Sequence, residues 1–222
     1  MNVPLWQAHT APDYDAIMRE ACAVLAARIR SDSTYRRQLL RDPRACHRNL
    51  FERFAPEGYK EYAGTYRGTP GTSLEHRPMH APSLQEGARF FAFVPPNHVP
   101  ARIAELLDTV EREREQARAA DRYVQLLYLT HLFAWFGAIH PFLDGNGHVQ
   151  RALFAAAAAE LNIPMSSRFA IHPRSYDRLL ASQLELFTRA NGGTPQLAAV
   201  AEYLAFWLGG PFDVPGSGIP KD

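Results

Sequence analysis

Residues able to do chemistry concentrate between His140 and Arg151, where the chain reads His-Pro-Phe-Leu-Asp-Gly-Asn-Gly-His-Val-Gln-Arg. The imidazole of His140 has an intrinsic pKa near neutrality and suits a general base acting on an incoming hydroxyl. The carboxylate of Asp144 is a hard oxygen ligand that can hold Mg²⁺ between two phosphates. Arg151 supplies a permanent cation with a bidentate geometry for phosphate oxygens. This combination predicts a catalytic loop that handles phosphate groups.

The phosphate-binding residues expected within this loop are Gly145, Asn146 and Gly147. Glycine lets a phosphate approach the backbone N–H groups without a Cβ in the way. Arg151 and the alanines of 155–159 predict a helix that ends near 162–164, so its N-terminus lies at or just after the glycines. Unpaired N–H groups and the helix dipole favour an anion at that point.

A second helix must bring the chain to His140. Apolar residues recur at helical spacing after Asp121 and predict one apolar helical face. The members of this face are Val124, Leu127, Tyr128, His131, Leu132, Trp135, Phe136 and Ile139. Because His131 lies on the apolar side, we predict that it is a core histidine. Pro141 pushes the residue before it out of the α region, so the helix should stop at His140.

The same residues also admit less specific interpretations. An Asp-Gly-Asn-Gly sequence is usually only a turn, and a single arginine such as Arg151 is usually a surface residue. Phe142 is expected to be structural, with its ring anchoring the loop in the core. A metal site formed by His140, Asp144 and His148 is a sharper alternative, because these residues are four apart and would share one face of a continuous helix. The proline and the glycines of the loop oppose such a helix.

The N-terminal part of the chain predicts three helices. The first begins near Pro12 or Asp13 and ends at 31–33, the second covers 34–41, and the third lies between Pro43 and Pro56. The apolar stripe expected on the first helix consists of Ile17, Ala21, Val24, Leu25 and Ile29. These helices are predicted to be scaffold.

The region from Gly58 to Pro96 contains too many glycines and prolines for long helices. The aromatic run 89–94 predicts a strand, and we expect a short hairpin around 85–94, with a buried edge strand as the alternative. Helices resume after Pro100, with an apolar stripe at Ile103, Leu106, Leu107 and Val110 and then a solvated charged face at 111–115.

The C-terminal third predicts two more helices and a tail. Residues that suggest the first helix are Tyr176, Leu179, Leu180, Leu184 and Phe187. The second helix is expected over 197–208, and the residues from 209 to 222 are expected to form a flexible tail.

Composition is that of an ordinary soluble globular protein, with 222 residues, 46% hydrophobic and 21% charged residues. A formal net charge of +1 gives no large basic face, so we expect no nucleic acid partner. Cys22 and Cys46 are too few for a disulfide framework or a zinc site and should be buried apolar residues in a reducing compartment. No leader-like segment and no run near the ~18 apolar residues of a membrane span is found, so we expect no membrane partner.

The segment from His140 to Arg151 resembles the signature of the Fic (filamentation induced by cyclic AMP) family, His-x-Phe-x-Asp/Glu-Gly-Asn-Gly/Lys-x-x-Arg. Every defined position is filled in order. Looser resemblances lie at His47 to Phe51 and Tyr62 to Arg67, and Phe91 to Pro96 is similar to the family's flap-and-proline region. The resemblance covers roughly Cys46 to Leu161. It implies an all-α, Fic-type helical bundle with a small β-hairpin flap.

Enzymes of this family typically transfer AMP from ATP to a Ser, Thr or Tyr hydroxyl of another protein and release pyrophosphate. The resemblance implies His140 as the base, Asp144 as the Mg²⁺ ligand, and Arg151 as the contact for the outer phosphates. The other implied nucleotide-binding residues are Gly145, Asn146, Gly147 and His148. The flap residues implied to pair with an extended target segment are Gly87, Ala88, Arg89, Phe90, Phe91, Ala92 and Phe93. Mg²⁺, ATP and a target protein with a modifiable hydroxyl are thus expected.

Two departures from the family pattern affect these expectations. Many members have Arg directly after Gly-Asn-Gly, whereas this chain has His148, a weaker and pH-dependent cation. The family's self-inhibitory motif, Ser/Thr-x-x-x-Glu-Gly/Asn, has no full copy, because 83–87 is one residue short and the segment 109–114 ends in Arg. A small antitoxin-like protein, or another form of restraint, is therefore expected to control the activity.

Three alternatives to AMP transfer follow from the same resemblance. The fold can use another phosphate-containing donor, or it can transfer the γ-phosphate, as relatives resembling Doc do. Those relatives often have Lys where this chain has Gly147, so the glycine favours AMP transfer. The third alternative is an inactive nucleotide- or protein-binding module, which the intact motif opposes.

The expected domain organisation is an N-terminal helical extension over 1–45, a Fic domain with C-terminal helices over 46–208, and a tail over 209–222. No internal repeat or linker separates a second domain. The expected location is the cytoplasm, or a host cell into which the protein is delivered as an effector.

Overall fold

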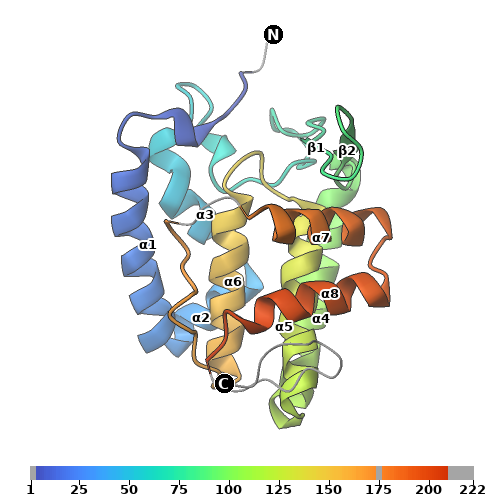
Figure 1. The fold of residues 1–222 in the computed structure, drawn as a ribbon. Helices are drawn as coiled ribbons and strands as arrows, with labels where there is room; N and C mark the ends of the chain where they lie inside the picture. The colour runs from blue at the N-terminus through green and yellow to red at the C-terminus, as the bar shows by residue number, and fades with distance from the viewer. Residues whose placement is uncertain (1–3, 174–176, 210–222) are drawn as a thin grey trace.

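A computed structural model describes residues 4–173 and 177–209. Within these ranges the chain forms a bundle of α-helices with one small antiparallel sheet (Figure 1). The helices are α1 (Tyr14–Ser31), α2 (Ser33–Arg41), α3 (Arg44–Phe51), α4 (Val99–Ala119), α5 (Arg122–Ile139), α6 (Asn146–Glu160), α7 (Arg178–Arg189) and α8 (Thr194–Ala205), and the strands are β1 (His80–Pro82) and β2 (Phe90–Ala92). The predicted fold class, an all-α bundle with a small β-hairpin, is confirmed.

Aspartates begin three of these helices. Asp32, Asp121 and Asp177 are the N-caps of α2, α5 and α7, and each accepts a hydrogen bond from the backbone N–H three residues further on. Such caps typically stabilise a helix by about 1 kcal/mol. Helices α2 and α5 each end two residues before a proline, because Pro43 and Pro141 cannot continue a helix.

Helix α5 lies at the centre of the bundle and is buried nearly all round. Helices α4, α6, α7 and α8 all pack against it, and one side of the helix is less buried than the rest, namely the side with Val124, Leu127 and His131. The predicted apolar face was therefore wrong in part. Val124 is 42% exposed, and His131 and Trp135 are half-buried, whereas Leu129 and Phe133 on other sides are fully buried.

The predicted stripe on α1 needs a similar correction. Val24 is 65% exposed, while Met18 and Cys22 take buried positions on this helix. Helical spacing of apolar residues predicts which face of a helix is buried, but single apolar residues such as Val24 are often exposed to solvent. Both cysteines, Cys22 and Cys46, are free and buried, as expected.

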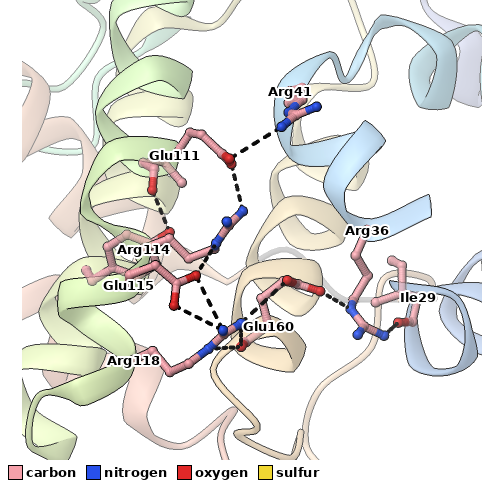
Figure 2. A network of polar contacts seen from close by, with 10 residues as sticks. Ile29, Arg36, Arg41, Glu111, Arg114, Glu115, Arg118 and Glu160 are labelled. Atoms are coloured by element: carbon pink, nitrogen blue, oxygen red, sulfur yellow. Dashed lines mark hydrogen bonds and ion pairs between the residues drawn. The ribbon is translucent and has the colours of Figure 1, made fainter. Parts of the chain in front are cut away.

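A buried carboxylate joins three helices at the end of α6. Glu160 is 6% exposed and pairs with Arg36 of α2, with 2.6 Å between Nε and Oε1. Arg118 of α4 donates from Nε and Nη2 to the backbone carbonyl of Glu160 at 3.1 and 2.8 Å. Figure 2 shows how this network continues to Glu111 of α4, which pairs with Arg41 of α2. It braces the bundle and contains no residue of the predicted loop.

The hairpin is formed by β1 and β2, with Ala81 opposite Phe91 in the antiparallel register. Its first strand lies at His80–Pro82, earlier than the predicted start near residue 85, because the turn between the strands is longer than the prediction allowed. The alternative of a buried edge strand is wrong, since Phe90 is 68% exposed. The hairpin lies at the same end of the bundle as the loop between α5 and α6 (Figure 1).

The C-terminal helices are close to the predicted ones. The helix predicted over 197–208 ends at Ala205 and is followed by a bridge between Met165 and Leu208. Tyr176 and the tail from 210 onward, which the sequence assigned to a helix and to a flexible segment, lie outside the described residues. Among the described helices, none has the length and apolar character needed to cross a membrane.

Candidate active site

The loop between α5 and α6 begins at His140, the C-cap of α5. Its backbone is left-handed, with φ 51° and ψ 61°, a conformation that costs a non-glycine residue roughly 1–2 kcal/mol. Its N–H still donates to the carbonyl of Phe136 at 3.0 Å. The helix therefore ends abruptly, and this end fixes the point from which the imidazole projects.

Arg67 stabilises this helix end. Its side chain is 0% exposed and donates to the carbonyls of Ile139 and His140 at 3.0 and 2.9 Å. It also donates to the carbonyls of Arg77 and Val94 at 3.0 and 3.2 Å, and burial lowers its pKa to about 10. Terminal carbonyls of a helix carry partial negative charge, so the guanidinium satisfies them and complements the dipole. Arg67 thus joins the end of α5 to the chain that leaves the hairpin.

His47 of α3 fixes the middle of the loop. Its ring stacks on Phe142, with centroids 3.8 Å apart and planes at 8°. Nδ1 accepts the N–H of Gly64 at 2.8 Å, so Nε2 carries the proton and donates to the carbonyl of Asp144 at 2.9 Å. Burial lowers the pKa of His47 to about 3, so the ring is neutral at pH 7. Phe142 is 0% exposed, which confirms its expected structural role.

Asn146 closes the loop on itself. Its Oδ1 accepts the N–H of Phe142 at 2.9 Å and its Nδ2 donates to the carbonyl of Phe142 at 2.8 Å. With both amide atoms engaged, any contact of Asn146 with a phosphate is left to its backbone N–H. Gly145, the N-cap of α6, has φ 74°, and a Cβ there would lie 2.5 Å from the ring of Phe51. No side chain can replace this glycine without displacing α3.

Burial follows a chemical division along the loop. The residues that keep partial exposure are His140, Asp144, Gly147, His148 and Arg151. The residues that are buried between them are Pro141, Phe142, Leu143, Gly145, Asn146, Val149 and Gln150. The bracing side chains therefore face the core, and the residues assigned to chemistry remain accessible to a substrate.

The N-terminus of α6 presents backbone donors at the exposed side of the loop. The N–H groups of Asn146 and Gly147 precede the first intrahelical bonds, in which His148 and Val149 donate to the carbonyl of Gly145. Fifteen residues of helix follow, so the dipole favours an anion here. The N–H of Gly145 itself donates to Oδ1 of Asp144 at 2.7 Å, which leaves two of the three predicted donors for a phosphate.

Arg151 lies beside these donors. A Cβ built on Gly147 would be 3.1 Å from Nη1 of Arg151, so the guanidinium rests against the first turn of α6. Its Nε donates to the carbonyl of Ile171 at 2.9 Å. The structure thus brings together the glycine turn and the cation that were predicted to bind a first and a second phosphate of the same substrate.

His148 differs from the expectation of a pH-dependent cation. Its ring stacks on His172 with centroids 5.3 Å apart, and Nε2 lies 3.2 Å from Nδ1 of His172. Burial, together with Arg151 and His172, lowers the pKa of His148 to about 3. The ring is therefore neutral near pH 7, where it can hydrogen-bond to a substrate and adds no charge. Nothing in the sequence pattern pointed to His172.

Asp144 has both carboxylate oxygens hydrogen-bonded to backbone N–H groups. Oδ2 accepts from Ala8 at 2.8 Å and Oδ1 accepts from Gly145 at 2.7 Å. Each oxygen keeps further acceptor capacity, so the carboxylate could hold Mg²⁺, whose preferred ligands are oxygen atoms. In the described part of the chain no group of three or more His, Cys, Asp or Glu is arranged to hold a metal. The alternative of a His140, Asp144 and His148 metal site is therefore wrong.

The ring of His140 is covered on one face by Phe93, with centroids 4.0 Å apart and planes at 17°. Burial is the main cause that lowers its pKa to about 3; Arg67 lowers it further, and a hydrogen bond to the backbone of Gly137 acts in the opposite direction. The imidazole is thus neutral throughout the physiological range.

The structure separates the seven predicted flap residues into two groups. Phe93 touches the imidazole of His140, and Phe90, Phe91 and Ala92 form β2 with its outer edge exposed. The remaining three, Gly87, Ala88 and Arg89, lie in the exposed turn before β2. β2 pairs only with β1 among the described strands, so its other edge can accept an extended segment.

Contacts that sequence reasoning missed come from distant parts of the chain. The N–H of Ala8 reaches Asp144 across 136 residues, and a backbone donor leaves no signal in the sequence. Trp6 packs edge-on against His47 at 5.9 Å and holds this N-terminal segment in place. His47 and Arg67 stood within the looser resemblance, but their spacing gave no hint of what they contact.

Comparisons with known proteins agree with this architecture. The structure is similar to that of a Fic domain containing signaling protein from Bacteroides thetaiotaomicron, with TM-score 0.61 and 18% identity over 88% of this chain and 69% of that chain. At that identity the likeness shows the fold alone. A search among curated proteins finds no match.

The sequence also matches the Fic/DOC family model over residues 40–158, which is more than half of the chain. The protein therefore belongs to the Fic/DOC family. Membership supports a transferase of the Fic fold as its class of enzyme.

Proposed function

We propose that this protein transfers AMP from ATP to a Ser, Thr or Tyr hydroxyl of a target protein and releases pyrophosphate. The observation that carries the proposal is the division of burial in the loop. His140, Asp144 and Arg151 keep partial exposure around the N-terminus of α6, while the residues between them are buried. A triphosphate placed there would meet a base, a metal ligand, backbone donors and a fixed cation.

The proposed reaction uses these residues in separate roles. The hydroxyl oxygen of the target attacks the α-phosphorus, the bond to the bridging oxygen of the β-phosphate breaks, and pyrophosphate leaves. A ring nitrogen of His140 takes the hydroxyl proton. The N–H groups of Asn146 and Gly147 hold phosphate oxygens in a geometry fixed before substrate arrives. Arg151 binds the phosphates that leave.

Mg²⁺ fits the donor set that Asp144 offers. Mg²⁺ is commonly held by one or two protein carboxylates together with substrate phosphates. When bound, the ion would neutralise phosphate charge as pyrophosphate forms. Asp144 would be held in orientation for it by the N–H groups of Ala8 and Gly145.

The direction in which the nucleotide binds decides between AMP transfer and γ-phosphate transfer. Gly147 supports AMP transfer, because relatives that transfer the γ-phosphate often have Lys at this position. A Cβ at Gly147 would lie 3.1 Å from Nη1 of Arg151, so the glycine also leaves room for this guanidinium. With Arg151 against the first turn of α6, the phosphates that leave are expected at this end and the α-phosphate near His140. The opposite orientation would place the γ-phosphate next to the imidazole.

Labelled ATP tests the proposal. Purified protein, Mg²⁺ and cell lysate are incubated with ATP labelled on the α-phosphate in one tube and on the γ-phosphate in the other. We expect protein-bound label from the α-position only, lost in His140→Ala and kept in His76→Ala, whose side chain is 90% exposed and far from the loop in sequence. Label from the γ-position would establish phosphorylation instead, and no label from either tube would favour a binding module.

A further inference from the structure

The turn end of the hairpin is held by a buried carboxylate on α7. Glu185 is 1% exposed and accepts the hydroxyl of Ser83 at 2.5 Å and the N–H of Leu84 at 2.6 Å. Both donors follow β1 directly, about one hundred residues before Glu185 in the sequence. Burial of a carboxylate is unfavourable unless charged or polar partners surround it. The contact therefore fixes the position of the hairpin relative to α7.

Arg189 of α7 completes the contact. Its Nε donates to Glu185 at 2.8 Å, its Nη2 to the hydroxyl of Ser83 at 3.2 Å, and its Nη1 to Glu86 at 3.1 Å. The same guanidinium lies 5.8 Å from the centroid of the Phe91 ring in β2. Burial by itself raises the pKa of Glu185, but the hydrogen bonds from Ser83, Leu84 and Arg189 outweigh it, and the pKa lies below its usual value. Glu185 is therefore charged at neutral pH.

The other end of the hairpin is held at the catalytic loop. Phe93 stacks on His140 at 4.0 Å, and its N–H donates to the carbonyl of Met79 at 3.1 Å. The next carbonyl, that of Val94, accepts from Nη2 of Arg67 at 3.2 Å. Between these two attachments the strands are exposed, as shown by Phe90. A hairpin of three-residue strands is not stable by itself, so its position depends on its two ends.

We propose that Glu185 is a positioning residue that locks the hairpin onto α7 and thereby keeps β2 and Phe93 in place beside His140. This contact would also keep the free edge of β2 in position for a target segment, and that part of the inference rests on the proposed function. The lock itself is a property of the fold and can be tested without nucleotide.

The test compares two substitutions that each remove one buried negative charge. Glu185→Gln keeps the size of the side chain but places an amide group among the donors Ser83, Leu84 and Arg189. Glu160→Gln is the matched control, since Glu160 is 6% exposed, pairs with Arg36, and braces α2 and α4 against α6 without touching the hairpin. Hydrogen–deuterium exchange of the backbone amides is then followed by mass spectrometry.

We expect Glu185→Gln to accelerate exchange in the peptide covering 79–94 on the order of tenfold, the factor associated with one lost hydrogen bond to a charged group. Exchange in α6 should stay at the rate of the unmodified protein. Glu160→Gln should accelerate exchange near α2 and the end of α6 and leave the hairpin unchanged. Hairpin exchange that is unaltered in Glu185→Gln, or accelerated equally by both substitutions, would overturn the proposal.

A spectroscopic readout separates positioning from simple stabilisation. The ring current of Phe93 should shift the Cε1–H signal of His140 upfield, and this signal is assigned by its loss in His140→Ala. We expect it to move downfield in Glu185→Gln and to stay in place in Glu160→Gln. Rapid hairpin exchange with an unchanged His140 signal would mean that the turn opens while Phe93 stays beside His140. That result would refute a positioning role for Glu185.

Labelled ATP keeps this result distinct from the proposed function. If the unmodified protein labels lysate proteins, Glu185→Gln should lower labelling several-fold at low lysate concentration and less at high concentration, with ATP binding by calorimetry unchanged. Equal labelling at all lysate concentrations would refute the lock's role in target presentation. If the unmodified protein labels nothing, the proposed function fails, and exchange and the His140 signal still decide whether Glu185 positions the hairpin.

Discussion

Replacement of His47 by phenylalanine tests how the catalytic loop is held. In this chain the rings of His47 and Phe142 stack with centroids 3.8 Å apart, and a phenylalanine at position 47 can keep that stacking. It cannot accept a hydrogen bond from the N–H of Gly64 or donate one to the carbonyl of Asp144. Each buried polar group left without a partner costs about 1–3 kcal/mol, so we expect a loss of roughly 2–6 kcal/mol at pH 7.5. Domains are stable by about 5–15 kcal/mol, so the shift of the urea midpoint should be large.

The pH dependence gives this prediction a second signature. The folded ring has a pKa of about 3, whereas the unfolded ring titrates near 6.5. Because the unfolded chain binds the extra proton below pH 6.5, His47 destabilises the fold progressively as the pH falls from 6.5 towards 3. At pH 5 this amounts to about 2 kcal/mol. The His47→Phe variant has no such titrating ring. The difference in free energy of unfolding between the unmodified protein and this variant should therefore be about 2 kcal/mol smaller at pH 5 than at pH 7.5.

Urea unfolding at both pH values, followed by circular dichroism, measures the two effects. His76→Phe is the control, because its side chain is 90% exposed and such changes alter stability by about 0.5 kcal/mol or less. His47→Gln is added in case the phenylalanine chain does not fold, since a glutamine amide can still donate to Asp144. A deficit that stays constant from pH 7.5 to pH 5 would refute the claim that His47 is a neutral, buried donor.

Three further predictions concern the same end of the bundle. Gly145→Ala should cost about 2–5 kcal/mol, because it combines a left-handed residue with a clash, and Gly71→Ala, with φ +76° and open space, should cost only the conformational part in thermal unfolding. Arg67→Lys should cost about 2–4 kcal/mol, since one ammonium cannot satisfy carbonyls at four positions; a loss below 1 kcal/mol by the same measurement would contradict the role of the guanidinium. The plot of kcat/KM for labelled ATP against pH should show no change caused by titration of His140 between pH 5.5 and pH 8.5, because the pKa of His140, about 3, lies outside that range. A fall in kcat/KM near pH 6.5 that disappears in a conservative His140 variant would contradict this reasoning.

Local chemistry made much of the fold predictable. Proline after Asp42 and after His140 stops a helix by geometry alone, and aspartates at N-caps mark helix starts. The glycine at the start of α6 follows from the same kind of local rule, whereas the left-handed backbone of His140 does not, because a residue before proline ordinarily takes an extended conformation. The predictable features depend on a few neighbouring residues, so the sequence contains the information.

Features set by tertiary packing could not be predicted in the same way. The face of α5 that carries Val124 was expected inside, but four helices surround α5 and their positions are not written in its spacing. The lowered pKa of His148 depends on burial and on His172, which lies 24 residues away. The earlier start of the hairpin at His80 reflects pairing across a long turn, which propensity does not reveal.

The loop of the active site depends on segments far from its own sequence. Backbone groups between His140 and Asp144 are satisfied by Arg67 and His47, which lie outside the signature. Without them, carbonyls at the end of α5 and in the loop would need water or a local partner, and the loop would lose its fixed shape. The signature can therefore act only together with the region around residues 47–67. The family match also begins before the signature, at residue 40. His47 and Arg67 are therefore the first positions to examine when an intact signature is found in an inactive protein.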